Sequence, residues 1–446
     1  MTDIVYITVD SLRADHVGWH GYERDTTPFL DSLSESAHTF TNAFSHGCYT
    51  RQAFPAMMAA EYPSISQSHG GLSEEYTPLA EALSEAGYTT GGFHSNPHLL
   101  PQFGYHRGFD RFYDSDTESS KLARLRQWVK DTIPSQSFLY STLEAVFSKT
   151  EEAGFNPGTP FVLADEITDL AIDWCQSVAT ESQRFLWVHY MDVHHPYSPP
   201  EEYQLAFREE AISERRAVKL RRKMVDQPEE VTDAELSDIV DLYDGEIRFV
   251  DDQVRRLVET VQSQWGADTL IAFTSDHGDE LNDHDDFAHR DTLFDELAHV
   301  PLLIQCGEQQ GVHEDMVGLM DLPPTFLECA GIEPPSTFRG ESLVKIMEGG
   351  STDQDYVLID EGETIAYRDR SWKYIVGPGR VELYNIQNDP GEQINVVDQH
   401  PEVVEEIEAT LEQYSELGTA DSDELTAGEF SGEVQDRLEQ LGYLQE

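Results

Sequence analysis

The stretch IVYITVD at residues 4–10 decides the fold of this 446-residue chain. A short run rich in β-branched residues that ends in an acid is typical of a buried strand in a largely parallel sheet. Sheets of this kind place their ligands at the carboxyl ends of the strands. Asp10 therefore stands where chemistry is expected.

The same pattern occurs twice more along the chain. The apolar run FLWV at residues 185–188 leads into His189, and TLIAFT at residues 269–274 is followed by Asp276 and His277. Because the carboxyl ends of parallel strands meet at one edge of a sheet, these polar side chains are expected to lie close together.

Asp10, Asp276 and His277 together suit a divalent cation. Carboxylate oxygens with one imidazole accept Mg²⁺, Ca²⁺, Mn²⁺ or Zn²⁺, and these residue types do not choose between the four metals. The sequence thus predicts one metal ion at the carboxyl edge of the sheet.

The segments between these strands have helical patterns, and short strand patterns separated by turns follow from about residue 355. We expect an α/β fold with a mainly parallel central sheet flanked by helices. The catalytic unit is predicted over 1–350, with a helical insertion over about 116–165. A small antiparallel sheet is predicted over 351–398, and a helix with an acidic tail over 399–446.

Acids outnumber bases by 85 to 29, which gives a net charge of −56. Nucleic-acid binding through a basic face is excluded, because each phosphate contact needs a cation. Charge repulsion of this size is screened only by concentrated salt. We interpret the chain as halophilic, and an acidic mesophilic protein is the alternative.

Neither a basic leader nor an apolar run near 18 residues is present, so we expect a cytoplasmic protein without a transmembrane segment. The four cysteines show no paired spacing, and neither a disulfide framework nor a cysteine metal site is indicated. The sequence does not indicate an oligomeric state.

Further motifs surround the metal candidates in a fixed order. They are VDSLRAD at 9–15, TPFLD at 27–31, YP at 62–63, GY at 87–88, HYMDVHHPY at 189–197, SDHGD at 275–279, His284, AH at 288–289, DE at 295–296, VPL at 300–302, DLPPT at 321–325, ELYN at 382–385, DP at 389–390 and Asn395. In this order they resemble the sulfatase family of the alkaline-phosphatase superfamily. The resemblance implies an alkaline-phosphatase-like fold and a hydrolase of sulfate or phosphate esters.

The resemblance also implies a nucleophile beside the metal. The family motif C-x-P-S-R places it 13 residues before the proline of Y-P, and counting back from Pro63 reaches Thr50. Cys48 is two residues out of register, and Phe54 replaces the motif arginine, so formylglycine is not expected. A metal-bound hydroxyl loses its proton readily, which makes Thr50 a sensible nucleophile and metal ligand. The alternatives are a helix-capping Thr50 and a nucleophilic Cys48 in a slipped motif.

Other roles follow from the resemblance with differing strength. His194 matches the histidine that contacts the ester oxygens or the leaving group, and His289 stands where sulfatases place a lysine. Asp192 is a candidate ligand of a second metal. The weaker candidates for substrate binding are His189, Arg13, Asn96 and His98. For two of these a structural role is the alternative, since His189 fits a core histidine and Arg13 an ion pair with Asp15.

Three functions remain open from the sequence. The leading one is a metal-dependent hydrolase of anionic sulfate or phosphate esters. The second is a phosphotransferase or phosphodiesterase acting on cell-envelope glycans or lipids, because relatives with threonine at the nucleophile position mostly transfer phosphoryl groups. The third is a catalytically silent, anion-binding homologue.

One basic cluster stands out against the acidic background. Six of the 29 basic residues fall within residues 215–223. The cluster is either a helix face paired with neighbouring acids or a docking patch for a polyanionic substrate or an anionic lipid surface.

Overall fold

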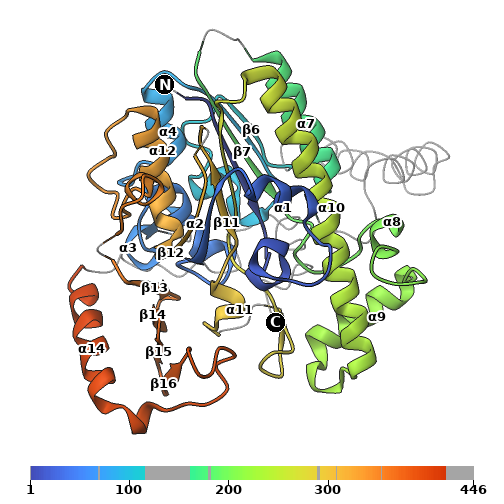
Figure 1. The fold of residues 1–446 in the computed structure, drawn as a ribbon, viewed down its shortest axis with the longest axis vertical. Coiled ribbons are helices and arrows are strands. Elements are labelled where there is room, and N and C mark those ends of the chain that lie inside the picture. Colours follow the sequence, from blue (N-terminus) through green and yellow to red (C-terminus); the bar gives the residue numbers. More distant parts are fainter. Residues whose placement is uncertain are drawn as a thin grey trace, which may run out of the picture.

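The computed structural model is an α/β structure built on one large sheet, with a second, smaller sheet towards the C-terminus (Figure 1). It describes residues 2–68, 71–115, 161–178, 182–288, 292–307, 309–352 and 354–417.

Eight strands form the central sheet, in the order β12-β2-β11-β8-β1-β7-β5-β6. Strands β8, β1, β7, β5 and β6 are parallel, and β11 runs antiparallel between β8 and β2. The bounds are β1 (Ile4–Val9), β2 (His38–Phe44), β5 (Thr89–Phe93), β6 (Arg111–Tyr113), β7 (Arg184–Tyr190), β8 (Leu270–Ser275), β11 (Leu302–Gln305) and β12 (Gly311–Gly318). The predicted mainly parallel sheet flanked by helices is confirmed.

The register of the three central strands places the candidate residues on one face. Thr8 pairs with His189 on β7 and with Thr274 on β8. Because side chains alternate across a sheet, Asp10 and Asp276, each two residues further on, continue the row begun by Thr8 and Thr274. These side chains are therefore directed to the same side at the carboxyl edge.

Helices cover both faces of the sheet and bury two apolar cores. The face that carries Tyr6 and Trp187 packs against α2 (Thr50–Ala59), α4 (Leu79–Glu85) and α12 (Leu322–Ala330). The opposite face packs against α1 (Pro28–Ser34), α7 (Ala164–Ser177) and α10 (Asp233–Trp265). Since the candidate side chains share the first face, α2 is the helix that can reach them.

Short elements complete the described chain. The helices are α3 (Pro63–Ser66), α8 (Glu201–Gln204), α9 (Glu214–Asp226), α11 (Asp295–Ala298), α13 (Val344–Met347) and α14 (Pro401–Ser415). The 3-10 turns are η1 (Ala14–His16), η2 (Gly18–His20), η3 (Pro97–Leu99), η4 (Pro101–Phe103), η5 (Pro228–Glu230), η6 (Leu319–Asp321) and η7 (Val397–Gln399). The hairpins are β3 (Gln67–Ser68) with β4 (Gly71–Leu72), and β9 (Glu280–Leu281) with β10 (Phe287–Ala288).

The predicted C-terminal antiparallel sheet is confirmed. It consists of β13 (Tyr356–Asp360), β14 (Ile365–Asp369), β15 (Trp372–Gly377) and β16 (Arg380–Asn385) in sequential order. Lys373 of β15 is fully buried, and its Nζ lies 2.7 Å from Asp295 Oδ1 on α11. Arg368 of β14 also pairs with Asp295. A buried cation of this sheet is thus neutralised by an acid from the preceding part of the chain.

Most of the predicted insertion, residues 116–160, and the acidic tail, residues 418–446, lie outside the described residues. The domain boundaries therefore stay predictions. Among the helices that the structure describes, each is too short or too polar to cross a bilayer.

Candidate active site

Asp10 and Asp276 lie at the carboxyl ends of the adjacent strands β1 and β8, and both are fully buried. The backbone N–H of His277 donates to Asp276 Oδ1 at 2.9 Å, and the N–H of Ser11 donates to the same oxygen at 3.3 Å. The Ser11 hydroxyl donates to Asp10 Oδ1 at 2.9 Å. These bonds fix the orientation of both carboxylates.

His277 completes this pair of acids. Its Nε2 lies 3.7 Å from both Asp10 Oδ1 and Asp276 Oδ2, while its Nδ1 lies 2.7 Å from the carbonyl oxygen of Gly278. A carbonyl only accepts, so Nδ1 carries the proton and Nε2 directs a lone pair at the carboxylates. A metal-binding histidine is typically oriented by this kind of bond.

His189 faces the same acids from β7. Its Nε2 lies 3.5 Å from Asp10 Oδ2, and its Nδ1 lies 3.0 Å from Thr8 Oγ1. The Thr8 hydroxyl donates to the Val188 carbonyl oxygen at 3.3 Å and accepts a hydrogen bond from Trp187 Nε1 at 3.1 Å. Because the Thr8 hydroxyl proton is used in the bond to the Val188 carbonyl, Thr8 Oγ1 accepts a hydrogen bond from His189 Nδ1. The other ring nitrogen of His189, Nε2, then carries no proton.

Asp10, His189 and Asp276 each place a ligand atom within 4.8 Å of the others. Two carboxylates and neutral imidazoles held by outer hydrogen bonds suit a divalent cation, so the residues present fit the metal that the fold family implies. His189 was expected among the substrate-binding residues, and the geometry groups it with the metal candidates, while its contact with a substrate stays a prediction. The position of His189 on β7 could have indicated this grouping, because His189 pairs in register with Thr8, which lies two residues before Asp10.

The two acids differ in proton affinity. Burial raises the pKa of Asp276 to about 8, and the neighbouring Asp10 carboxylate adds to the rise. Burial also opposes ionisation of Asp10, but His194, His189 and His277 hold its pKa well below its usual range. Two carboxylates this close ionise together only when a positive charge compensates them.

Thr50 is buried at the first turn of α2, beside the acids. Its hydroxyl donates to Asp10 Oδ2 at 3.2 Å. Asn96 lies next to both groups, and its Nδ2 donates to Asp10 Oδ2 at 2.9 Å and to Thr50 Oγ1 at 3.3 Å. The N-terminal end of a helix favours developing negative charge, which suits an oxygen nucleophile at this position.

Asn96 is itself held by a local turn. It caps η3, where the backbone N–H of His98 donates to Asn96 Oδ1 at 2.8 Å. This bond fixes which end of the amide is directed at Asp10. Asn96 and His98 were both predicted to bind substrate, but they take different positions. Asn96 Nδ2 contacts Asp10 in the site, whereas the backbone N–H of His98 orients the Asn96 side chain.

His194 takes part in the electrostatics of the same site, since it contributes to the lowered pKa of Asp10. Its Nδ1 lies 2.5 Å from the carbonyl oxygen of His195, which leaves Nε2 as the nitrogen for a ligand. His289 lies outside the described residues, so its predicted contact stays a prediction.

Two other candidates have surroundings that bear on their predicted roles. The Arg13 guanidinium donates to both oxygens of Asp15 and both oxygens of Asp283, which fits the alternative of an ion pair, and its contact with a substrate stays a prediction. Cys48 is buried among apolar residues, and burial raises the pKa of its thiol further from the reactive range. Cys48 is therefore a poor nucleophile.

Asp192 does not join the candidate metal group. Its Oδ1 accepts from the Ala164 backbone at 3.0 Å, and burial raises the pKa of its carboxyl to about 8. The hydrogen bond caps the start of α7, which is a structural role for this acid.

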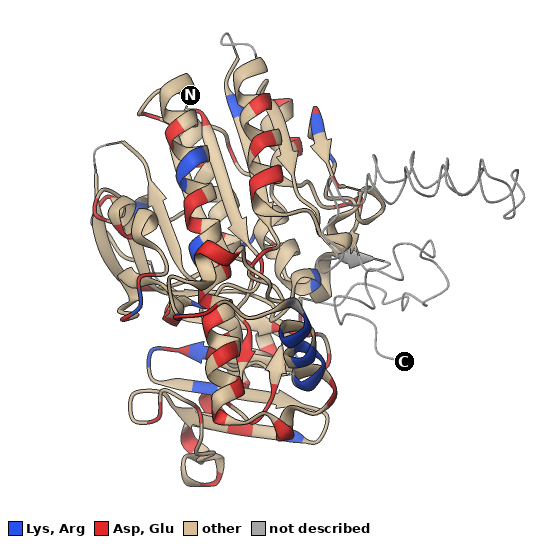
Figure 2. Ribbon diagram, turned by 90° about the vertical axis from the view of Figure 1, so that its right-hand side faces the viewer, with Lys and Arg blue, Asp and Glu red and all other residues tan. Residues whose placement is uncertain are grey.

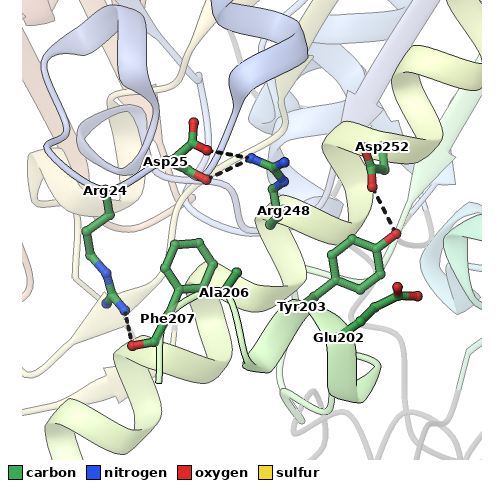
Figure 3. A pocket seen from close by; sticks show the side chains of 8 residues that line it. All are labelled: Arg24, Asp25, Glu202, Tyr203, Ala206, Phe207, Arg248 and Asp252. Carbon is green, nitrogen blue, oxygen red and sulfur yellow. Dashed lines mark hydrogen bonds and ion pairs between the residues drawn. The ribbon is translucent and has the colours of Figure 1, made fainter. Parts of the chain in front are cut away.

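A surface cavity of about 440 Å³ lies between α8, α10 and the loop before α1, and contains none of the site residues (Figure 3). The Arg24 guanidinium lies 4.6 Å from the centre of the Phe207 ring at its wall, and Arg248 pairs with Asp25. Both cations are engaged by the protein, so the cavity has no free anion-binding group of its own.

Comparisons with known proteins point to one family. The family model described as sulfatase matches residues 2–332, and the model described as N-sulphoglucosamine sulphohydrolase, C-terminal, matches residues 283–417. The arylsulfatase of Clostridium perfringens is 24% identical over 443 residues, covering 89% of this chain and 90% of that protein.

Two solved structures share the fold. The phosphonate monoester hydrolase of Agrobacterium radiobacter has a TM-score of 0.71 at 22% identity, covering 96% of this chain and 98% of that chain. A protein solved in complex with its substrate D-glucosamine-2-N,6-O-disulfate also has a TM-score of 0.71, at 17% identity, covering 93% of this chain and 98% of that chain.

Proposed function

Because this chain belongs to the sulfatase family and is an ester hydrolase, we propose that it cleaves sulfate or phosphate esters with Thr50 as the nucleophile at a divalent-metal site. One observation carries the proposal. Thr50 Oγ1 lies 3.2 Å from Asp10 Oδ2, beside the two other members of the candidate metal group. A hydroxyl in this position is within reach of any cation that the acids hold.

Asp10, Asp276, His277 and His189 would hold the cation, which supplies positive charge to the ester oxygens and lowers the pKa of a bound hydroxyl. The chain's own residues then determine the geometry. Asn96 Nδ2 donates to Thr50 Oγ1 and keeps this oxygen beside Asp10. The N-terminus of α2 favours the alkoxide form of Thr50.

Thr50 Oγ1 attacks phosphorus or sulfur, and the bond from that atom to the leaving alcohol breaks. The product is a covalent threonine ester and a free alcohol. The Thr50 hydroxyl proton passes to His194 Nε2, the nitrogen left without a proton because Nδ1–H is bonded to the His195 carbonyl, and His194 then gives this proton to the leaving oxygen. Water then attacks the threonine ester, which releases the anion and restores the Thr50 hydroxyl.

A transferase is the second candidate. Threonine in place of cysteine favours phosphoryl over sulfuryl chemistry, and the likeness to a phosphonate monoester hydrolase fold is consistent with a phosphorus centre. An acceptor alcohol in place of water would convert the same first half-reaction into transfer. The third candidate is a catalytically silent homologue that binds anions.

A substrate panel tests the proposal. The metal-loaded protein is assayed on an aryl sulfate, an aryl phosphate, a bis-aryl phosphate and an aryl phosphonate monoester, each with and without an added alcohol. Turnover that depends on Thr50 supports the proposed hydrolase, and alcoholysis products support the transferase. Bound metal without turnover on any of the four substrates would favour the silent homologue.

A further inference from the structure

A second group of metal-capable side chains lies just beyond the candidate active site. Glu280 begins β9, His284 lies between β9 and β10, and Glu296 belongs to α11. Each places a ligand atom within 4.8 Å of the others. His284 Nδ1 lies 2.5 Å from Glu296 Oε1 and 3.5 Å from Glu280 Oε1. We call these three residues the Glu–His–Glu group.

Burial distinguishes this group from the many acids at the surface. Figure 2 shows acidic residues along most of the helices, so an exposed acid by itself marks no site. The side chains of Glu280, His284 and Glu296 are only 2%, 14% and 7% exposed. Among the side chains that the structure describes, neither glutamate forms an ion pair with a lysine or an arginine. Because buried carboxylates need positive charge beside them, the group favours a cation.

Glu280 has one oxygen that the protein leaves unsatisfied. Its Oε1 accepts the backbone N–H of His284 at 2.7 Å, whereas its Oε2 is buried and has no hydrogen-bond partner within the described parts of the chain. The unpartnered oxygen belongs to the carboxylate that faces His284, so it lies at the group. A buried acceptor without a donor destabilises the fold, and a bound cation would offset this cost.

His284 has the orientation of a metal ligand. Its Nε2 lies 3.4 Å from the carbonyl oxygen of Glu392, and since a carbonyl only accepts, Nε2 carries a proton. The imidazole stacks on Phe294, with ring centres 3.7 Å apart and ring planes at 8°. These two contacts direct Nδ1 at the carboxylates. A hydrogen bond from the outer ring nitrogen is typical of histidines that bind metal.

The two glutamates attract positive charge to the position of His284. Burial opposes the charged ring, but the bonds with Glu280 and Glu296 raise the pKa of His284 to about 10. A protonated His284 balances only one of the two carboxylates. A divalent cation bound to the neutral imidazole would balance both.

We propose that the Glu–His–Glu group binds a divalent transition-metal cation of the Zn²⁺ class, apart from the cation expected at Asp10. Imidazole together with carboxylates suits Zn²⁺, whereas Ca²⁺ and Mg²⁺ prefer oxygen ligands. Zinc bonds of about 2.0–2.1 Å place tetrahedral ligands about 3.3 Å apart, which is close to the present spacing of Glu280 and His284. Glu296 has to withdraw by about 1 Å, and water supplies the fourth ligand.

A cation in this position joins segments that adjoin the candidate active site. Glu280 follows the metal candidate Asp276 by four residues, and Gly278 between them donates its N–H to the Leu297 carbonyl of α11 at 2.8 Å. The same cation therefore holds the loop after β8 against α11. The inference does not depend on the reaction at Thr50.

The test compares the zinc content of three full-length proteins: the unaltered chain, Glu280→Gln and the matched control Glu246→Gln. Both glutamates are buried and accept one backbone N–H, from His284 and from Ser198, and glutamine keeps this acceptor. Each protein is stripped with EDTA, kept at one KCl concentration where circular dichroism shows all of them folded, equilibrated with Zn²⁺ and freed of unbound ions by gel filtration.

We expect Glu280→Gln to retain one Zn²⁺ per chain fewer than the unaltered protein, and Glu246→Gln to retain the same number. Any metal at Asp10 is common to all three proteins and cancels in the comparison. Equal zinc content in the unaltered protein and Glu280→Gln would overturn the site, leaving His284 as a protonated partner of two acids. Turnover enters neither result, so failure of the proposed function leaves this test intact.

A second measurement decides the question if Glu280→Gln does not fold. Crystals of the unaltered protein are grown with Zn²⁺ and measured at the zinc absorption edge. An anomalous peak between Glu280, His284 and Glu296 supports the site. The absence of that peak overturns it, whether or not a peak is present at Asp10.

Discussion

Thr50 Oγ1 and Asp10 Oδ2 lie 3.2 Å apart although forty positions separate the two residues in the chain. The parallel sheet brings Asp10 to its carboxyl edge, and α2 covers the same face of the sheet and begins at Thr50. The contact therefore follows from the fold and from the point at which this one helix starts.

The Thr50→Ala variant should lose turnover by roughly three orders of magnitude or more, because the attacking oxygen is removed. The Thr50→Ser variant retains a hydroxyl and should keep measurable activity. Steady-state kinetics on the best substrate of the panel checks both, with circular dichroism as the test of folding. Full activity of the alanine variant would exclude the covalent route.

Thr8→Val should weaken metal binding by about 10- to 100-fold, because it removes the hydroxyl that holds His189 Nδ1. Thr39→Val changes a buried threonine on β2 and serves as the control. Calorimetric titration with Mn²⁺ measures the affinity, and saturating metal should restore the activity of Thr8→Val. Equal affinity for the two variants would remove His189 from the proposed ligands.

Stability should fall as the pH rises from about 4 to 7. Burial raises the pKa of both Asp251 and Asp321 to about 7, so the native state keeps protons that the unfolded chain has released in this range. The free energy of unfolding then decreases with pH, on the order of 1.4 kcal/mol per pKa unit and group. Urea unfolding at constant KCl concentration measures this slope.

The control for the pH dependence is a pair of single variants. Asp321→Asn removes one of the buried acids that titrate in this range and should make the slope shallower, whereas Asp398→Asn changes an exposed acid and should leave the slope unchanged. Stability that increases between pH 5 and 7 in the unaltered protein would contradict the assignment.

Potassium chloride should stabilise the protein strongly. A net charge of −56 repels itself across the molecule in dilute buffer, and the Debye length falls from about 10 Å at 0.1 M salt to about 3 Å at 1 M. The thermal unfolding midpoint should rise steeply over this range. A flat response would make the chain an acidic protein without adaptation to salt.

The sequence predicts the site best where a strand ends in a metal-capable residue. Asp10, Asp276 and His277 each follow an apolar run, so their convergence could be expected from the topology of parallel strands. Arg13 is different, because its partner Asp283 is 270 positions away and no local pattern reveals such a pair. The role of His98 in orienting Asn96 depends on a side-chain bond within one 3-10 turn, which periodicity does not report.

Some features of the fold could likewise be predicted from the sequence and others could not. The alternating short strands of the C-terminal sheet are visible in the sequence. The antiparallel direction of β11 between β8 and β2 is not, because the four residues LLIQ carry no pattern that indicates direction.

The ammonium group of Lys373 is buried in the small C-terminal sheet, away from water. The acid that neutralises it, Asp295, lies outside that sheet. Grafting that sheet onto a relative, or exchanging it for a foreign one, would thus succeed only if cation and acid were inherited together.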